Sequence, residues 1–257
     1  MEKEKLIIQI KKWLEEAAAY IRKNIRAEIE VTEKSGRTDL VTNMDEEIQG
    51  FLIDKIQKNY PKDRILGEEK GYSSIDSFTG RVWIIDPIDG TMNFVMEKEN
   101  FCIMIGIYVD GKGELGFIYD VMNHQCYWGG VDLGVHCNDH LLESPKMKSL
   151  SDGLMGMNAF MFGKNIHHAK EIGETSRGIR VTGCAGLELI AMLKGNHIGY
   201  LSNLYPWDYA AGIVLLNEFG FFYSNVSGEP LKFSGREYFL AATPVAYQEI
   251  TSQYFNL

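Results

Sequence analysis

The order of hydrophobic patterns along the chain restricts its fold more than any single motif does. Apolar residues recur at helical spacing over about residues 3–27, and a second helix is expected from Thr42 to Lys58, where Thr42 and Asp45 form a capping box. From about residue 64 the pattern changes to short apolar strands joined by turns, and in the second half strands alternate with helices. This order predicts a mixed, layered arrangement of sheets and helices.

The expected elements fall into two halves. The polar segment Glu33–Arg37 is expected to be a loop. A second polar stretch, from about Asn138 to Asp152, is the expected boundary between an N-terminal half, residues 1–140, and a C-terminal half, residues 141–257. Strands of the first half are expected at 64–67, 82–85, 101–109, 114–119 and 125–128. The second half is expected to hold strands at 179–182, 197–201, 221–223 and 238–241, and helices at 183–193, 209–218 and 245–254.

The charge and apolar content of the chain exclude several kinds of partner. Its 26 basic and 35 acidic residues give a net charge of −9 without any basic cluster, so binding to nucleic acid is not expected. The longest apolar stretch, Phe101–Val109, is about half the length that a membrane span needs. The first residues contain too few apolar side chains for a signal peptide, and the four cysteines show no paired spacing. A cytoplasmic location with reduced thiols is therefore expected.

Acidic residues stand where elements end, and the densest such segment is Asp86-Pro87-Ile88-Asp89-Gly90-Thr91. Its proline and glycine turn the chain sharply, so Asp86 and Asp89 are expected to face one point. The proline has no N–H, and the carbonyl of Ile88 is expected to turn inward as a further oxygen ligand. Two nearby carboxylates repel each other unless a cation separates them, and all-oxygen ligands suit Mg²⁺. Gly90 allows a phosphate group to approach the backbone.

Three further acidic positions also lie at element ends. Glu68 follows a strand, Asp45 lies in the first turn of a helix, and Asp208 opens another helix. Each alone has an ordinary explanation as a solvated loop or a helix cap, and the Asp86–Thr91 segment alone is a common turn composition. Together they are the kind of oxygen cluster that several strand ends supply. Spacing in the sequence does not show that the four segments meet.

Three runs of the sequence closely resemble the signatures of the inositol monophosphatase family. They are Leu66-Gly67-Glu68-Glu69, Trp83-Ile84-Ile85-Asp86-Pro87-Ile88-Asp89-Gly90-Thr91-Met92-Asn93-Phe94 and Trp207-Asp208-Tyr209-Ala210-Ala211-Gly212. Further family elements are matched by Asp39-Leu40-Val41-Thr42-x-x-Asp45 and Gly183-Cys184-Ala185. The matches follow the family order and cover essentially the whole chain. The resemblance implies an α+β fold, layered as an α-β-α-β-α sandwich, and a Mg²⁺-dependent, lithium-sensitive phosphatase activity.

The resemblance also implies roles for individual residues. Two to three Mg²⁺ ions per site are expected on Glu68, Asp86, the Ile88 carbonyl, Asp89 and Asp208, with Asp45 serving an additional, weaker ion. Glu68 and Thr91 are expected to position the attacking water, and Asp45 is expected to be catalytic with them. Substrate binding is expected at Asp89, Gly90, Thr91, Gly183, Cys184, Ala185, Leu201 and Asp208.

Two positions depart from the family pattern and leave the substrate open. Leu201 stands where inositol-hydrolysing members carry a glutamate that contacts substrate hydroxyls, and Cys184 stands where many relatives carry Ser or Thr. A leucine accepts no hydrogen bond, so the site loses discrimination for hydroxyl groups. Inositol-1-phosphate phosphatase is the first interpretation, and a phosphatase for NADP(H), another nucleotide or fructose-1,6-bisphosphate is the second. A non-catalytic regulatory protein is the third.

The resemblance extends to assembly, because members of the family are typically homodimers. The apolar stretch Phe101–Val109, together with Tyr127-Trp128, is expected to offer a surface for contact with a second copy. The expected protein is a homodimer that takes a small phosphate ester and has neither a nucleic-acid nor a membrane partner.

Overall fold

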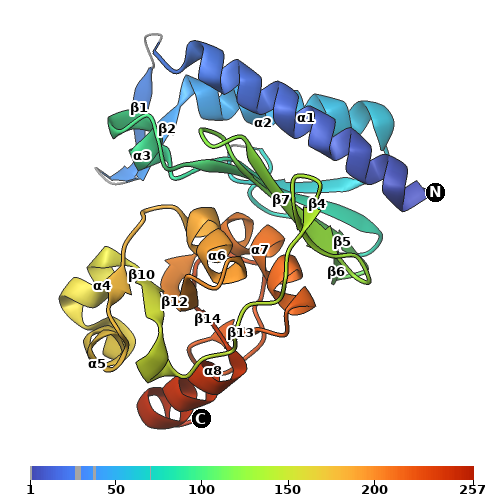
Figure 1. Cartoon of the computed structure of the whole chain (residues 1–257). Coiled ribbons are helices and arrows are strands. Elements are labelled where there is room, and N and C mark those ends of the chain that lie inside the picture. The colour runs from blue at the N-terminus through green and yellow to red at the C-terminus, as the bar shows by residue number, and fades with distance from the viewer. Residues whose placement is uncertain (1, 27–29, 37–38, 70) are drawn as a thin grey trace.

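The computed structural model describes residues 2–26, 30–36, 39–69 and 71–257, which build a layered molecule with its termini near opposite ends (Figure 1). Two long helices cover a seven-stranded sheet, and two further helices separate this sheet from a second, five-stranded one. Short helices cover the far face of the second sheet. The α-β-α-β-α order confirms the layered fold expected from the sequence.

The elements have the following bounds. The helices are α1 (Glu2–Asn24), α2 (Asn43–Asn59), α3 (Thr91–Met96), α4 (Ala159–Lys164), α5 (Ala169–Thr175), α6 (Ala185–Leu193), α7 (Pro206–Glu218) and α8 (Pro244–Ile250). The first sheet has the order β3-β4-β5-β6-β7-β8-β9, with β3 (Arg64–Gly67), β4 (Arg81–Asp89), β5 (Cys102–Val109), β6 (Lys112–Asp120), β7 (Gln125–Gly130), β8 (Gly134–Cys137) and β9 (His140–Leu141). The second has the order β11-β10-β12-β14-β13, with β10 (Leu154–Met157), β11 (Ile179–Arg180), β12 (His197–Leu204), β13 (Phe222–Asn225) and β14 (Glu237–Ala242). A hairpin pairs β1 (Val31–Gly36) with β2 (Asp39–Thr42), 3₁₀ turns lie at Leu150–Asp152 and Ile166–His168, and a π-helical turn lies at Thr251–Phe255.

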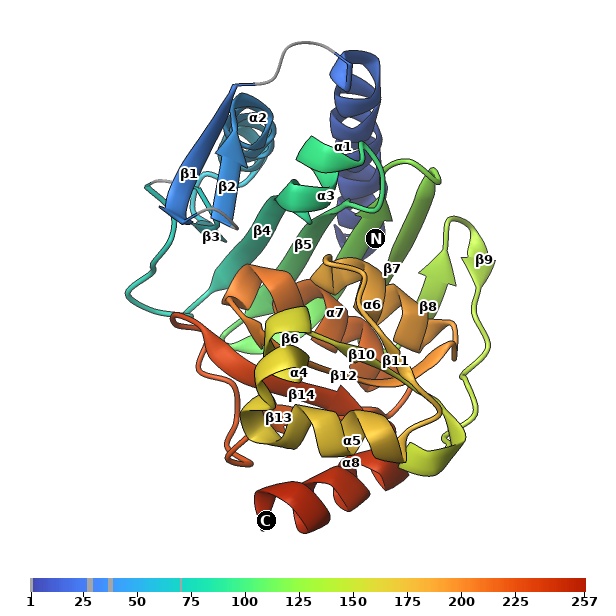
Figure 2. The ribbon, with the colours of Figure 1, turned by 90° about the vertical axis from the view of Figure 1, so that its left-hand side faces the viewer.

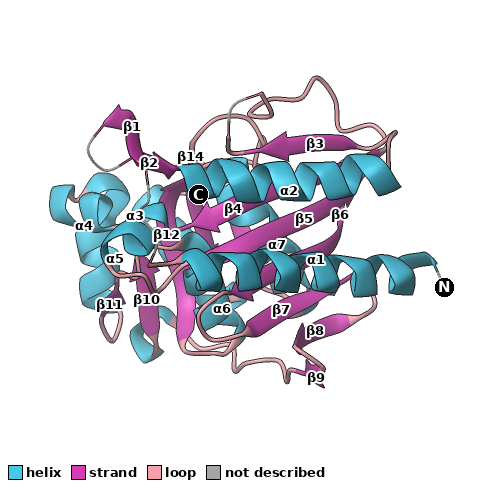
Figure 3. Ribbon diagram, turned by 90° about the horizontal axis from the view of Figure 1, so that it is seen from above, coloured by secondary structure: helices cyan, strands magenta, loops and turns pink. Residues whose placement is uncertain are grey.

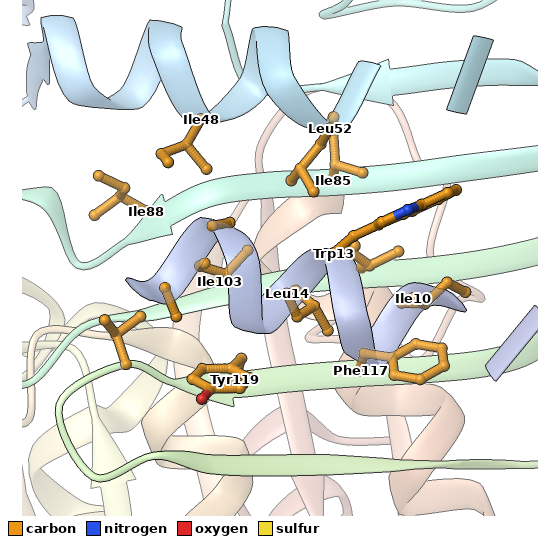
Figure 4. Packing of buried hydrophobic residues seen from close by; sticks show 14 of the residues in the cluster. Ile10, Trp13, Leu14, Ile48, Leu52, Ile85, Ile88, Ile103, Phe117 and Tyr119 are labelled. Atoms are coloured by element: carbon orange, nitrogen blue, oxygen red, sulfur yellow. The ribbon is translucent and has the colours of Figure 1, made fainter. Parts of the chain in front are cut away.

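Helices α1 and α2 lie side by side over one face of the first sheet (Figure 3). The apolar stripe of α1 carries Ile10, Trp13 and Leu14, all of which are buried. Figure 4 shows these side chains packed with Ile48 and Leu52 of α2 against the strands. The apolar residues that recur at helical spacing near the N-terminus thus form the face that α1 buries on the sheet.

Strand β5 is buried on both faces, which explains the continuous apolar run at residues 101–109. Ile103 and Ile105 face the core under α1 and α2, whereas Cys102 and Met104 face the core around α6 and α7. Tyr127 on β7 is also buried in the second of these cores. The stretch expected to contact a second copy is therefore core within a single chain, and that part of the prediction is wrong.

Helix α7 is buried on nearly all sides because it lies between the two sheets (Figure 1). Gly116 on β6 permits the close approach, since an added Cβ would lie 2.2 Å from the carbonyl oxygen of Ala211. The hydroxyl of Tyr108 on β5 donates to the carbonyl oxygen of Ala210 at 2.9 Å. The body of α7 thus packs on the first sheet, although its sequence belongs to the second half. The division at residue 140 into two halves stays a prediction.

The main differences from the sequence predictions concern short or polar elements. The segment expected as a loop at residues 33–37 instead contributes to strand β1, so that prediction is wrong for residues 33–36; residue 37 lies outside the described residues. The run from Val31 to Gly36 is mostly polar and shows no alternation of apolar and polar residues, so the sequence did not reveal this strand. Figure 2 shows this hairpin beside α2 and near α3.

The short elements β8, β9, β10, α4 and α5 were not predicted, because α4 and α5 have only six and seven residues and β9 only two. Periodicity needs longer windows than these. The methionines Met155, Met157 and Met161 in this part are each at most 1% exposed, in agreement with a packing role. Among the helices within the described ranges, none combines the length and the apolar character that crossing a bilayer requires.

Candidate active site

The acidic segment at the end of β4 forms a bulge. In the pairing with β5, Asp86 lies opposite Met104 and Asp89 opposite Cys102, so three steps along β4 match two along β5. Residues three apart on a regular strand point to opposite faces, and the extra residue cancels that alternation. The N–H of Ile88 donates to Asp86 Oδ1 at 3.1 Å and holds the turn. As a result, Asp86 and Asp89 line the same cavity.

Thr91, at the start of α3, connects two of the expected metal ligands. Its hydroxyl lies 3.2 Å from Asp45 Oδ1 and 3.0 Å from the carbonyl oxygen of Ile88, and donates to these oxygens. Asp45 is fully buried in the first turn of α2, where it accepts the N–H of Thr42 at 2.8 Å in a capping box. The helix cap and the site therefore use the same carboxylate, because its second oxygen accepts from Thr91 at the start of α3.

Two further carboxylates reach the cavity from other elements. Glu68, directly after β3, is half-buried and lines the cavity beside Asp86. Asp208, in the first turn of α7, also lines it, and its Oδ2 accepts the N–H of Tyr205 at 2.9 Å. The structure thus brings together the acidic residues of four separate segments, which spacing alone did not establish.

Burial and mutual repulsion raise the pKa values of Asp86 and Asp208. The pKa of Asp86 lies well above its ordinary value, first because of burial and then because of the charges of Glu68, Asp89, Asp208 and Asp45. Burial raises the pKa of Asp208 in the same way, and the charges of Asp89 and Glu68 raise it further. A bound cation would supply the positive charge that such a cluster needs. Because the donors are carboxylate and carbonyl oxygens, they fit a hard cation such as Mg²⁺.

Asp89 differs from the other carboxylates because four groups donate to it. The N–H of Ala185 donates to Oδ1 at 3.2 Å and the N–H of Gly186 to Oδ2 at 2.5 Å. The thiols of Cys184 and Cys102 lie 3.1 and 3.5 Å from Oδ2. Burial raises the pKa of Asp89, and these hydrogen bonds partly offset the rise. The carboxylate is thereby fixed to the first turn of α6.

Asn93 connects two segments of the site, a role not expected from the sequence. Its Nδ2 donates to the carbonyl oxygens of Asn100 at 2.9 Å and Thr182 at 2.8 Å, which ties α3 to the loop before α6. That loop contains Gly183, whose φ of 75° is in the left-handed region and where a Cβ would lie 3.0 Å from Asn93 Oδ1. The signal was its place within the Trp83–Phe94 run, but nothing in the sequence revealed the distant partner.

The cavity beside the acidic residues has a volume of about 850 Å³. Ser202 and Asn203 of β12 form part of its wall, together with Tyr205 and the exposed Arg236. The guanidinium carbon of Arg236 lies 4.6 Å from the centre of the Tyr205 ring, which in turn stacks on Trp207 at 4.7 Å. The cavity therefore has a negative end and an aromatic, positively charged rim. Other expected site residues that line it are Gly90, Thr91, Gly183, Cys184 and Ala185.

Leu201 is placed away from this cavity. Its side chain is fully buried in the core between β12 and α8, together with Met157, Leu240 and Ile250. Alternation along β12 is the reason, since Tyr200 and Ser202 line the cavity and the residue between them points to the other face. The expectation that Leu201 binds substrate does not agree with this position.

Comparison with known protein families matches the inositol monophosphatase family model to residues 2–255. The chain belongs to this family. Inositol-1-monophosphatase of Bacillus subtilis (strain 168) is 40% identical over 251 residues, which cover 96% of this chain and 95% of that protein. The family resemblance found in the sequence is thus confirmed, and the chain is a phosphatase of the phosphoric monoester hydrolase class.

Solved structures of relatives superpose closely. SaIMPase-II with bound inositol monophosphate is 36% identical, with a TM-score of 0.87 over 98% of this chain and 93% of that one. The same staphylococcal protein with bound 2′-AMP gives a TM-score of 0.88 at 36% identity, over 98% and 94% of the two chains. An IMPase/NADP phosphatase complexed with Mg²⁺ and phosphate is 27% identical, with a TM-score of 0.88 over 98% and 94%.

Proposed function

We propose that the chain hydrolyses phosphomonoesters with Mg²⁺ as its cofactor and that inositol-1-phosphate is its preferred substrate. The observation that carries the proposal is the group of carboxylates whose charges raise the pKa of the buried Asp86. Cations bound by such a group offset the repulsion between its carboxylates and can act on a phosphate ester. The relatives support the choice, since one is an inositol-1-monophosphatase and another holds inositol monophosphate.

The residues proposed to hold the ions are Glu68, Asp86, the Ile88 carbonyl, Asp89 and Asp208, with Asp45 supporting an additional one. Bound Mg²⁺ supplies positive charge to the phosphate and lowers the pKa of a water. The Thr91 hydroxyl donates its hydrogen bond to Asp45 Oδ1 and the Ile88 carbonyl oxygen, so the lone pairs of the hydroxyl oxygen are left to orient that water. Glu68, which directly follows β3, is proposed to take the proton as a general base.

The phosphate group is proposed to lie against Gly90. A Cβ at this position would lie 3.0 Å from Cys184 Cβ, and its φ of 90° suits glycine. The residues that follow, Thr91 and Met92, line the cavity and begin α3, so their N–H groups have no helical partner of their own. Backbone donors of this kind bind phosphate oxygens without adding charge to the site.

A second candidate substrate is a nucleotide with a 2′-phosphate. The aromatic ring of Tyr205 and the guanidinium of Arg236 lie together at the cavity rim, where a base can stack and a second anionic group can pair. SaIMPase-II has been solved with 2′-AMP, which supports this candidate. The same guanidinium keeps fructose-1,6-bisphosphate among the compounds to test, because that substrate also carries a second phosphate.

The test is phosphate release from inositol-1-phosphate, adenosine 2′-phosphate, NADP⁺ and fructose-1,6-bisphosphate at several Mg²⁺ concentrations. Asp86→Asn is the inactive control, because it removes a ligand charge and keeps the shape of the side chain. We expect Mg²⁺-dependent release, fastest with inositol-1-phosphate. Protein that is folded but releases no phosphate from any of the four compounds would favour the non-catalytic, regulatory interpretation instead.

We further propose a cytoplasmic homodimer that Li⁺ inhibits, on the strength of the family resemblance. One relative has been solved as an LiCl-soaked inhibitory complex, which supports the lithium part. The contact between copies is not proposed at residues 101–109, because these are buried within the chain. Light scattering at micromolar concentration tests the assembly, and a monomeric mass would refute it.

A further inference from the structure

Two thiols lie against the carboxylate of Asp89, behind the oxygen cluster. Cys102 begins β5 and Cys184 precedes α6, and their sulfur atoms are 3.7 Å apart. Within the part of the chain that the structure describes, ligand atoms of Asp89, Cys102 and Cys184 all lie within 4.8 Å of one another, and all three residues are buried. The cysteines are 82 positions apart, so the sequence did not suggest that they meet.

The spacing of these atoms suits a small tetrahedral metal ion. Zinc binds thiolate sulfur at about 2.3 Å and carboxylate oxygen at about 2.0 Å. A regular tetrahedron with these bonds has a sulfur–sulfur edge of about 3.8 Å and sulfur–oxygen edges of about 3.5 Å. The observed separations are 3.7 Å between the sulfurs, 3.1 Å from Cys184 Sγ to Asp89 Oδ2 and 3.5 Å from Cys102 Sγ to the same oxygen.

The surroundings hold the three ligands in place and give access to them. Gly186 packs so closely on the thiol of Cys102 that an added Cβ would lie 2.4 Å from its Sγ. Cys184 and Asp89 both line the cavity, so an ion can reach them from there. The carbonyl oxygen of Asp89 lies 3.4 Å from Cys184 Sγ and provides a further oxygen at the same place.

We propose that Cys102 Sγ, Cys184 Sγ and Asp89 Oδ2 form a binding site for a thiophilic divalent cation, represented by Zn²⁺ or Cd²⁺. Soft sulfur ligands select such ions over Mg²⁺, which prefers an all-oxygen shell. Each thiol releases one proton to solvent when its sulfur binds the ion, so two protons leave per ion and no group is oxidised or reduced.

Occupancy of this site is expected to inhibit the enzyme. Asp89 is also a proposed Mg²⁺ ligand, and the soft ion would engage Oδ2 and draw it toward the sulfurs. The inhibition rests on the proposed function, whereas binding of the soft ion does not. A binding measurement therefore separates the two.

The experiment titrates the full, reduced, Mg²⁺-free protein with Cd²⁺ and follows the thiolate-to-cadmium charge-transfer absorption in the ultraviolet. Cys184→Ser and Cys102→Ser each remove one sulfur and keep the size of the side chain. The matched control is Cys126→Ser combined with Cys137→Ser, because these cysteines lie outside the cluster. We expect one ion per chain in the wild type and in the control. Either cluster variant should weaken its binding at least about tenfold.

A second measurement needs no variant and covers the case in which one fails to fold. X-ray absorption at the cadmium edge counts neighbours of the bound ion, and we expect two sulfurs with oxygen completing the shell. A shell of oxygen alone around the bound ion, or equal ultraviolet charge-transfer absorption in Cys184→Ser and the wild type, would overturn the proposal. Phosphate release with added Zn²⁺ is then compared with each variant's own Zn²⁺-free rate, and Cys184→Ser should be less inhibited.

The outcomes for site and function remain distinguishable. Protein that binds Cd²⁺ through two sulfurs but hydrolyses no phosphate ester keeps the thiol site and refutes the proposed function. Protein that hydrolyses inositol-1-phosphate but binds Cd²⁺ through oxygen alone keeps the function and refutes the thiol site.

Discussion

Asparagine substitutions at Asp89 and Asp86 should both abolish activity but differ in their effect on folding. Among the described residues, one N–H donates to Asp86, from Ile88 to Oδ1, so the amide of Asp86→Asn can place its NH₂ at the other position. Asp89 accepts a backbone N–H at each oxygen, from Ala185 and Gly186. In Asp89→Asn the amide NH₂ therefore faces one of these N–H groups in either orientation.

The difference can be given a magnitude. A buried N–H left without an acceptor costs about 1–3 kcal/mol, so the free energy of unfolding of Asp89→Asn should be lower than that of Asp86→Asn by about that amount. For a chain of this size the melting temperature changes by about 2–4 °C per kcal/mol, which gives a difference of about 2–12 °C. Urea denaturation in EDTA measures the difference in the free energy of unfolding, and phosphate release in Mg²⁺ measures the activity of the same variants. If Asp89→Asn is as stable as Asp86→Asn, the reasoning from the α6 hydrogen bonds is refuted.

Three further predictions concern packing, pH and substrate choice. Leu201→Ala should lower the free energy of unfolding in urea titrations by about 2–5 kcal/mol, because the side chain is fully buried. The KM for inositol-1-phosphate should stay unchanged, because the side chain lies away from the cavity, and a changed KM would contradict this. Since the folded-state pKa values of Asp86 and Asp208 are raised, the unfolded chain loses these protons at lower pH than the folded chain does. The free energy of unfolding in EDTA should therefore fall as pH rises above about 3.9 and stay lower once pH exceeds the raised values. Mg²⁺ should largely remove this fall, and urea midpoints measured across pH with and without Mg²⁺ check the prediction. Arg236→Ala should raise the KM for adenosine 2′-phosphate about two- to tenfold and leave that for inositol-1-phosphate unchanged, and an equal effect on both would remove the argument for a nucleotide subsite at Tyr205.

The sequence predicted the parts of the fold that long-period patterns encode. The stripe of α1, the capping box at Thr42 and Asp45, and the run that became β4 all depend on residues close together in the chain. The β1–β2 hairpin was missed because the mostly polar run of β1, Val31 to Gly36, shows no alternation of apolar and polar residues. The direction of Leu201 was also missed, since its face depends on the register of β12 between β10 and β14.

For the candidate site, the motif residues around Asp86 and Asp89 were identified because their chemistry is local. The links between segments were not, because they join residues far apart in the chain. Asn93 bonds to Thr182, 89 positions away, and Cys184 meets Cys102 across 82 positions. The periodicity of the sequence does not encode such contacts, because they depend on how distant segments pack, as where α6 packs against β5.

Helix α7 couples the binding of ions in the site to the stability of its own packing on the first sheet. Its body packs on the first sheet and its first turn carries Asp208, so detachment of α7 from that sheet withdraws this carboxylate from Asp86 on β4. Any ion held by both residues therefore resists that detachment, by about 2.7 kcal/mol at a concentration one hundred times its dissociation constant. Amide protons along the middle of α7, which touch no ligand, should then exchange more slowly when Mg²⁺ is added.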